Sequence, residues 1–164
     1  MLLSKSTLSY ITYTLLSNKD IRERLTKELS DVDPENLNWQ NLEDHVYLYG
    51  VIQEGLRLNY GVSQRSPRIA RTENLMYRSQ DGQYQYMIPK GSAIGASARI
   101  LHHDEKAFPD SHRFLPERWI TSDGQRNSPL EKYLMSFSKG SRQCLGMKYV
   151  SFLNVHTQSF CLCA

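Results

Sequence analysis

One short stretch near the C-terminal end, Phe137 to Gly146, constrains this chain more than any other. It holds a single cysteine, Cys144, with glycines on both sides and Arg142 two positions before it. Glycines let a backbone pass close to a flat ligand, and loop N–H groups or a helix N-terminus stabilise a thiolate. A segment that can form such a helix follows, from Leu145 to His156. The stretch is a candidate metal-ligating thiolate loop. The alternative, a turn around a buried structural cysteine, is the default for a lone cysteine.

The composition indicates an ordinary globular chain. It has 164 residues, 40% hydrophobic and 23% charged, which suits one domain and argues against disorder. A net charge of +3 is too small to indicate a nucleic-acid partner. The N-terminal region lacks the run of about 20 apolar residues that a membrane span needs.

The cysteines favour neither disulfides nor zinc. Their number is odd and no CxxC occurs, so no disulfide framework or structural zinc site is predicted. Cys161 and Cys163 with His156 offer a conceivable metal trio without a convincing fourth ligand. Incidental cysteines in a frayed tail are the favoured interpretation.

Apolar spacing predicts three helices in the first part of the chain. Apolar residues recur with helical periodicity over residues 4–17 and again over 19–30. A third helix is expected from about 41 or 46 to 59, and Gly61 is placed to end it. On that helix Glu54 and Arg57 are three residues apart and share a face. From the pattern alone they read as an exposed ion pair worth at most about 1 kcal/mol.

After Gly61 the pattern changes to short strands. Runs at 68–71, 75–77 and 84–88, with an Asp81-Gly82 turn between the last two, predict a small antiparallel sheet. Ser97 is placed to cap a short helix through Leu101. From His102 to Ser136 little periodicity is visible, which indicates an irregular connector, and the pair His102-His103 is expected to face solvent there.

Three motifs in a fixed order now carry a family resemblance. They are Glu54-x-x-Arg57, then Pro116-Glu117-Arg118-Trp119, then Phe-x-x-Gly-x-Arg-x-Cys-x-Gly over the Cys144 stretch. In this order they resemble the C-terminal portion of the cytochrome P-450 family, most closely its filamentous-fungal, secondary-metabolism members. The resemblance covers about residues 4–150, and residues 151–164 diverge from it. It implies an α+β, mainly helical fold, the haem-proximal part of a single partial domain spanning 1–164.

The resemblance also implies roles for particular residues. Cys144 would be the axial thiolate ligand of haem iron, in a loop with Phe137, Gly140 and Gly146. Arg142 and Arg68 are the candidates for contacts with the haem propionates. Glu54, Arg57 and Arg118 would form a buried salt-bridge triad, a folding device with no catalytic role.

The implied chemistry is haem-thiolate monooxygenation of an organic substrate, with electrons from an NADPH-dependent flavoprotein reductase. Between Arg126 and Lys148 five residues are basic and one is acidic, which would suit an acidic electron donor, although a merely solvated basic loop explains them equally well.

No residue from 1 to 20 matches the family's oxygen-activating acidic-Thr pair. We therefore expect a truncated chain that is inactive on its own. The alternatives are an active enzyme whose missing part is a gene-model artefact, and a haem-binding or interaction fragment without turnover. Family members are anchored in the endoplasmic-reticulum membrane. This chain is expected to lack the anchor, leaving a cytoplasmic or undefined location.

Overall fold

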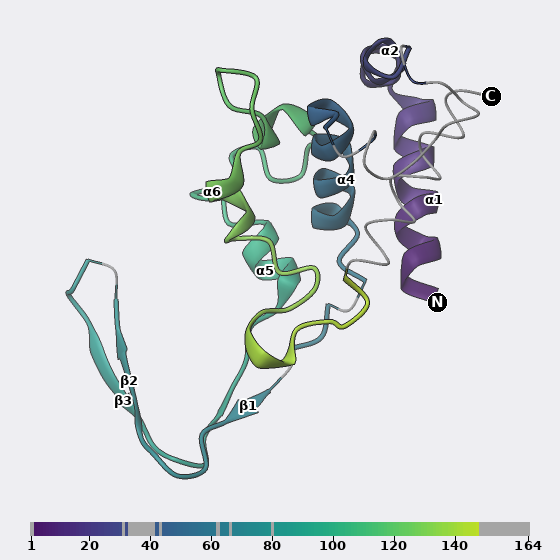
Figure 1. Cartoon of the computed structure of the whole chain (residues 1–164). Coiled ribbons are helices and arrows are strands. Elements are labelled where there is room, and N and C mark those ends of the chain that lie inside the picture. Colours follow the sequence, from purple (N-terminus) through teal and green to yellow (C-terminus); the bar gives the residue numbers. More distant parts are fainter. Residues whose placement is uncertain are drawn as a thin grey trace. The chain divides into compact units, whose positions relative to one another are not determined.

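The chain divides into two compact units, Met1–Ser63 with Ala98–Ala164, and Gln64–Ser97. The computed structural model describes residues 2–30, 32, 42, 44–61, 63–65, 67–79 and 81–147. Figure 1 shows the elements of both units coloured along the sequence.

The first unit is built on three helices. They are α1 (Leu2–Ser17), α2 (Lys19–Glu28) and α4 (Val46–Leu58), which correspond to the three predicted from apolar spacing. The third begins at the later of the two predicted starts, and Gly61 beyond its end has a positive φ of 59°. All three helices contribute to one buried cluster, which consists of Ile11, Leu15, Leu25, Leu29, Leu42, Tyr47, Leu48, Val51, Ile52 and Leu56.

The central helix of this unit, α4, is fixed at its start and along its length. The Glu28 carboxylate accepts hydrogen bonds from the backbone N–H groups of Tyr47 (2.7 Å) and Leu48 (2.8 Å), two donors that a helix start leaves without intrahelical partners. Two glycines allow close packing along α4. A Cβ at Gly55 would lie 2.2 Å from Ile11 Cγ1 on α1, and one at Gly50 would lie 2.7 Å from the Pro116 carbonyl oxygen.

The second part of this unit contains short elements separated by turns. They are α5 (Ala98–His102), η2 (Pro116–Trp119), α6 (Ser128–Glu131) and η3 (Gly140–Arg142). The expected short helix and irregular connector are both present. The expectation that His102 faces solvent is wrong, because its side chain is fully buried.

The second unit contains two small antiparallel sheets, where the sequence predicted one. Strand β2 (Leu75–Arg78) pairs with β3 (Gln85–Ile88), and β1 (Arg68–Ile69) pairs with β4 (Ala93–Ile94). Figure 1 shows β2 and β3 side by side as a hairpin. The predicted Asp81-Gly82 turn holds Gly82 at a φ of 71°, and Gly91, before β4, has a φ of 85°, a region that glycine enters without strain. The two-residue strand β4 was not predicted.

Helices and small antiparallel sheets together give a mixed α and β architecture, as the resemblance implies. The predicted final helix, from Leu145 to His156, falls almost entirely outside the described residues. None of the helices in the described part of the chain is long and apolar enough to cross a membrane.

Candidate functional site

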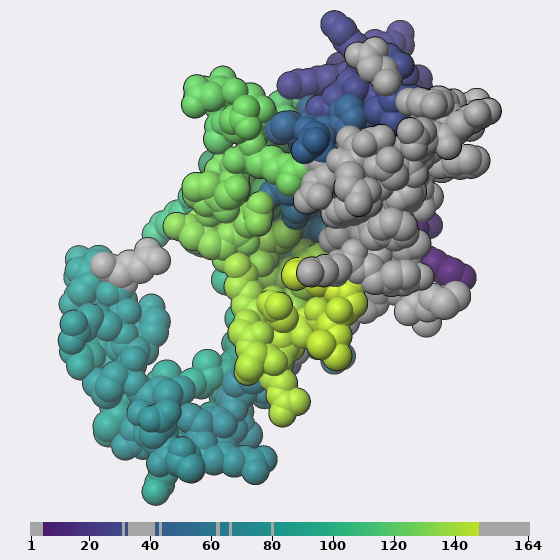
Figure 2. Space-filling model, in the orientation of Figure 1, coloured from purple at the N-terminus to yellow at the C-terminus, as the bar shows by residue number. Residues whose placement is uncertain are grey.

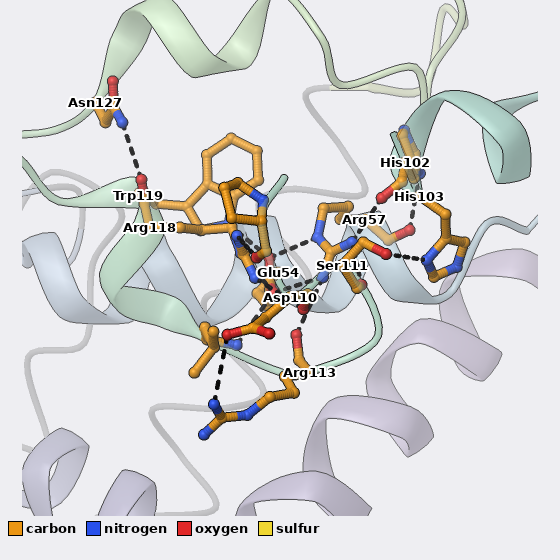
Figure 3. Close-up of polar contacts among 12 residues, drawn as sticks. Glu54, Arg57, His102, His103, Asp110, Ser111, Arg113, Arg118, Trp119 and Asn127 are labelled. Carbon is orange, nitrogen blue, oxygen red and sulfur yellow. Dashed lines mark hydrogen bonds and ion pairs between the residues drawn. The ribbon is translucent and has the colours of Figure 1, made fainter. Parts of the chain in front are cut away.

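The Glu54 carboxylate, on α4, is the centre of the polar network in Figure 3. It is fully buried. Oε1 accepts hydrogen bonds from Arg57 Nη2 (2.7 Å), Arg118 Nε (3.0 Å) and the Leu115 backbone N–H (3.1 Å). Oε2 accepts from Arg57 Nε (2.8 Å) and Trp119 Nε1 (2.9 Å). These five hydrogen bonds offset the free-energy cost of burying the charged carboxylate.

The Arg57 guanidinium uses all five of its N–H donors. Two of them donate to Glu54, and the others donate to backbone carbonyls of the connector. Nη1 donates to His102 O and Ser111 O, both at 2.7 Å, and Nη2 donates to Arg113 O at 3.1 Å. One side chain on α4 therefore fixes the backbone at three positions of a segment that has little regular structure.

Arg118 extends the network to two further backbone carbonyls of the same segment. Its Nε binds Glu54, while Nη1 and Nη2 donate to the carbonyls of Pro109 (2.9 Å) and Asp110 (3.4 Å). The structure thus brings Glu54, Arg57 and Arg118 together through ion pairs of 2.7 and 3.0 Å. The exposed ion pair indicated by the helical pattern alone is wrong, since the Glu54 and Arg57 side chains are both 0% exposed.

The sequence pattern assigned no role in this network to two of its members, Trp119 and His102. Trp119 is fully buried and donates its indole N–H to Glu54. Its position directly after Arg118, in the turn η2, was the available signal. His102 ends α5, and its ring lies between two backbone groups, the Arg57 carbonyl and the Met135 N–H. No local pattern marked this histidine as buried.

The Cys144 loop begins directly after this region. Phe137 packs against the helical core, and its carbonyl accepts the Cys144 backbone N–H at 2.9 Å. Between them Ser138 and Gly140 have positive φ of 59° and 80°, so the chain turns sharply twice. The loop is the yellow-green segment at the surface in Figure 2.

The structure places the remaining predicted residues as follows. Cys144 is an exposed, free thiol. Arg142 is exposed at the end of η3. A Cβ at Gly146 would lie 3.8 Å from Cys144 Sγ, so the glycine lies beside the sulfur. Arg68 is exposed on β1, in the second unit.

These residues fit a thiolate ligand to haem. The described part of the chain has no group of three or more His, Cys, Asp or Glu able to hold a bare metal ion. A haem iron, however, needs only one ligand from this side. An exposed sulfur, fixed through its own backbone N–H and flanked by a residue without a Cβ, offers a soft donor open to a flat ligand.

A buried Glu-x-x-Arg pair, an arginine from a Pro-Glu-Arg-Trp turn and a single-cysteine loop are the combination that resembles haem-thiolate proteins. The chain belongs to the cytochrome P450 family, whose sequence model matches residues 4–149. The predicted family membership is therefore confirmed, and the match extends over both compact units.

Similar curated proteins are fungal, as the resemblance indicated. Cytochrome P450 monooxygenase ppzE of Metarhizium majus is 48% identical over 155 residues, covering 85% of this chain and 33% of that protein. Cytochrome P450 monooxygenase MO6277 of Ascocoryne sarcoides is 47% identical over 148 residues, covering 88% and 27%. Cytochrome P450 monooxygenase tpcC of Cochliobolus heterostrophus is 43% identical over 139 residues, covering 83% and 26%. The chain thus spans about a quarter to a third of the length of these relatives.

Proposed function

We propose that residues 1–164 form the C-terminal, haem-proximal part of a single cytochrome P450 monooxygenase domain, with Cys144 as the axial thiolate ligand. The observation that supports this most is the exposed Cys144 thiol, anchored through its N–H to the Phe137 carbonyl and flanked by Gly146, in a chain of this family. When bound, haem would supply the oxygen-activating chemistry by which one oxygen atom enters an organic substrate. The names of the fungal relatives favour the same reaction class.

The chain's own residues would bind and orient the cofactor. Phe137, half-buried on the helical core, fixes the base of the loop. Gly140 supplies the turn at φ 80°, which L side chains rarely adopt. Arg142 is exposed on the loop, and we propose that it pairs with a haem propionate; Arg68, exposed on β1, is a second candidate for that role. The Glu54, Arg57 and Arg118 triad would hold the connector and have no catalytic role.

Electron supply and turnover are further parts of the proposal. Family members generally receive electrons from reductases, and we propose an NADPH-dependent flavoprotein that docks on the basic residues around the loop, of which Lys139 and Arg142 are exposed. A polypeptide of these 164 residues alone is expected not to turn over substrate, because residues 1–20 offer no acidic-Thr pair for proton delivery.

The test is a carbon monoxide difference spectrum of the reduced, haem-reconstituted chain. We expect the red-shifted band of a thiolate ligand in the unaltered chain and its loss in Cys144→Ala. Ser141→Ala, an exposed change in the same loop, is the matched control and should keep the band. A thiolate band that survives in Cys144→Ala would refute the ligand assignment.

A further inference from the structure

We propose that His102 is a positioning residue that fixes the base of the Cys144 loop to the C-terminal turn of α4. The imidazole is fully buried. Its Nδ1 lies 2.7 Å from the Arg57 carbonyl oxygen, and its Nε2 lies 2.8 Å from the Met135 backbone nitrogen. A role of the loop as a haem ligand rests on the function proposed above. The link between His102 and the loop stands on the geometry alone.

These two contacts determine the protonation state of the ring. The Arg57 carbonyl can only accept a hydrogen bond, and the Met135 N–H can only donate one. His102 must therefore be neutral, with its proton on Nδ1 and a lone pair on Nε2. A proton on Nε2 would face the Met135 N–H and break the link to the loop.

The surroundings of the ring favour the same state. Burial lowers the pKa of His102 to about 4 against the opposing effect of the hydrogen bond to the Arg57 carbonyl, and the nearby positive charge of Arg57 also lowers the pKa. The other titratable groups that act on it are His103, which also lowers the pKa, and Glu54, which raises it. The rings of Tyr60 and Phe108 lie 6.1 and 6.3 Å away, centroid to centroid.

From Met135 the attachment continues residue by residue to the cysteine. The next residue, Ser136, donates its hydroxyl to the Leu56 carbonyl on α4 at 2.7 Å. Phe137 packs on the core, and its carbonyl holds the Cys144 N–H at 2.9 Å. His102 and Ser136 thus bind two backbone carbonyls in the last turn of α4, where carbonyl groups have no hydrogen-bond partner within the helix. These contacts anchor the segment that leads into the loop.

Two substitutions of His102 test its hydrogen bonds to the Arg57 carbonyl and to the Met135 N–H separately. His102→Asn places an amide N–H near the position of Nδ1 and leaves the Met135 N–H without an acceptor. His102→Gln places an amide oxygen near the position of Nε2 and keeps that acceptor. His112→Gln is the control, since His112 is exposed and its ring stacks on that of His103 at 4.1 Å.

The readouts require no haem. In the full chain we would measure hydrogen exchange of the Met135 and Cys144 amides, each followed on its own peptide by mass spectrometry. In His102→Asn we expect both rates to rise about tenfold while the α4 amides are unchanged. In His102→Gln and His112→Gln we expect rates within about twofold of the unaltered chain.

Equal effects of the Asn and Gln changes, or unchanged exchange of the Met135 and Cys144 amides in His102→Asn, would overturn the proposal. Faster exchange throughout α4 would likewise overturn it, because it would show general destabilisation. One measurement needs no variant. Long-range ¹H–¹⁵N correlation of the His102 ring at neutral pH should show the Nδ1–H tautomer, and an Nε2–H or doubly protonated ring would refute the geometry. Since none of these readouts involves haem, a negative carbon monoxide spectrum would contradict the proposed function without affecting the test of His102.

Discussion

The guanidinium groups of Arg57 and Arg113 differ in burial and in the number of hydrogen bonds they donate. Arg57 donates all five N–H groups to buried acceptors. Arg113 is 70% exposed and makes a 3.6 Å ion pair with Asp110. Arg57→Lys keeps the charge but offers three donors from one point, so buried carbonyls and part of the Glu54 carboxylate lose their partners. We expect a loss of about 3–5 kcal/mol in the free energy of unfolding, measured by urea denaturation.

Arg113→Lys is the matched control for that substitution. An exposed pair of this kind contributes about 0–1 kcal/mol, so we expect almost no change in the urea midpoint. If the two substitutions destabilised the chain equally, the buried network would not be the source of the effect.

The stability of the chain should also depend on pH through His102. Burial lowers its pKa to about 4, against about 6.5 in an unfolded chain. Between these values the unfolded state binds a proton that the folded state does not, so the free energy of unfolding falls as the pH falls, by up to about 1.4 kcal/mol per pH unit. The stability difference between the unaltered chain and His102→Gln should therefore narrow from pH 7 towards pH 4.5 in urea titrations. Parallel curves would contradict a buried neutral His102.

At the scale of the elements, the approach of α4 to α1 depends on Gly55. Helix propensity alone predicts that Gly55→Ala stabilises α4 by about 1 kcal/mol. The new Cβ, however, would lie 2.2 Å from Ile11 Cγ1 and 2.5 Å from Ile11 Cδ1. We expect a net destabilisation of about 1–3 kcal/mol and a lower Tm.

A double-mutant cycle isolates this contact. Ile11→Ala alone should cost about 2–5 kcal/mol as a core truncation, and adding Gly55→Ala should cost far less than in the unaltered background, because the Cβ then has room. Strictly additive effects would show that the two residues do not meet.

The elements that the sequence predicted well are those whose signal is local. The apolar spacing of α1, α2 and α4 lies within each helix, and the Asp81-Gly82 turn fixes the β2–β3 hairpin. Strand β4 was missed because a strand of two residues is too short to show an alternating pattern. Its partner, β1, lies some 25 positions earlier in the sequence, so no local signal reveals the pairing. His102 was assigned to solvent because the composition around it is polar, whereas its burial depends on Arg57, 45 residues earlier.

For the whole molecule, the two compact units should differ in stability. A two-stranded hairpin with many exposed side chains is only marginally stable by itself, and Met76, Tyr77, Tyr86 and Met87 are all more than half exposed. Native-state hydrogen exchange should show β2–β3 amides opening at much lower free energy than those of α4.

Tyr86→Ser sharpens this comparison, because the Tyr86 ring stacks on those of Tyr77 and Tyr84 within the hairpin. We expect faster exchange in the hairpin and no change in α4. Equal opening free energies for β2–β3 and α4 would instead indicate one cooperative unit.

Only those parts of the candidate site that belong to recognisable sequence motifs could be predicted from the sequence. The order of Glu54, Arg118 and Cys144 identified the family, and the structure adds how Glu54 is surrounded. The helical pattern alone assigned Glu54 and Arg57 to the surface, since an i, i+3 pair looks the same on an exposed and on a buried face. Their burial depends on Leu115 and Trp119, which no local pattern connects to α4.

The separation of these partners along the chain has a consequence for biosynthesis. The donors from Leu115, Arg118 and Trp119 come 61 to 65 residues after Glu54. A ribosome therefore completes α4 long before the groups that cover its charged pair exist. Until Trp119 has left the exit tunnel, Glu54 and Arg57 must stay hydrated, because burying them without these donors would cost several kcal/mol. Synthesis thus imposes an order on folding, in which the face of α4 that carries Glu54 and Arg57 is covered only after the Pro-Glu-Arg-Trp turn has emerged.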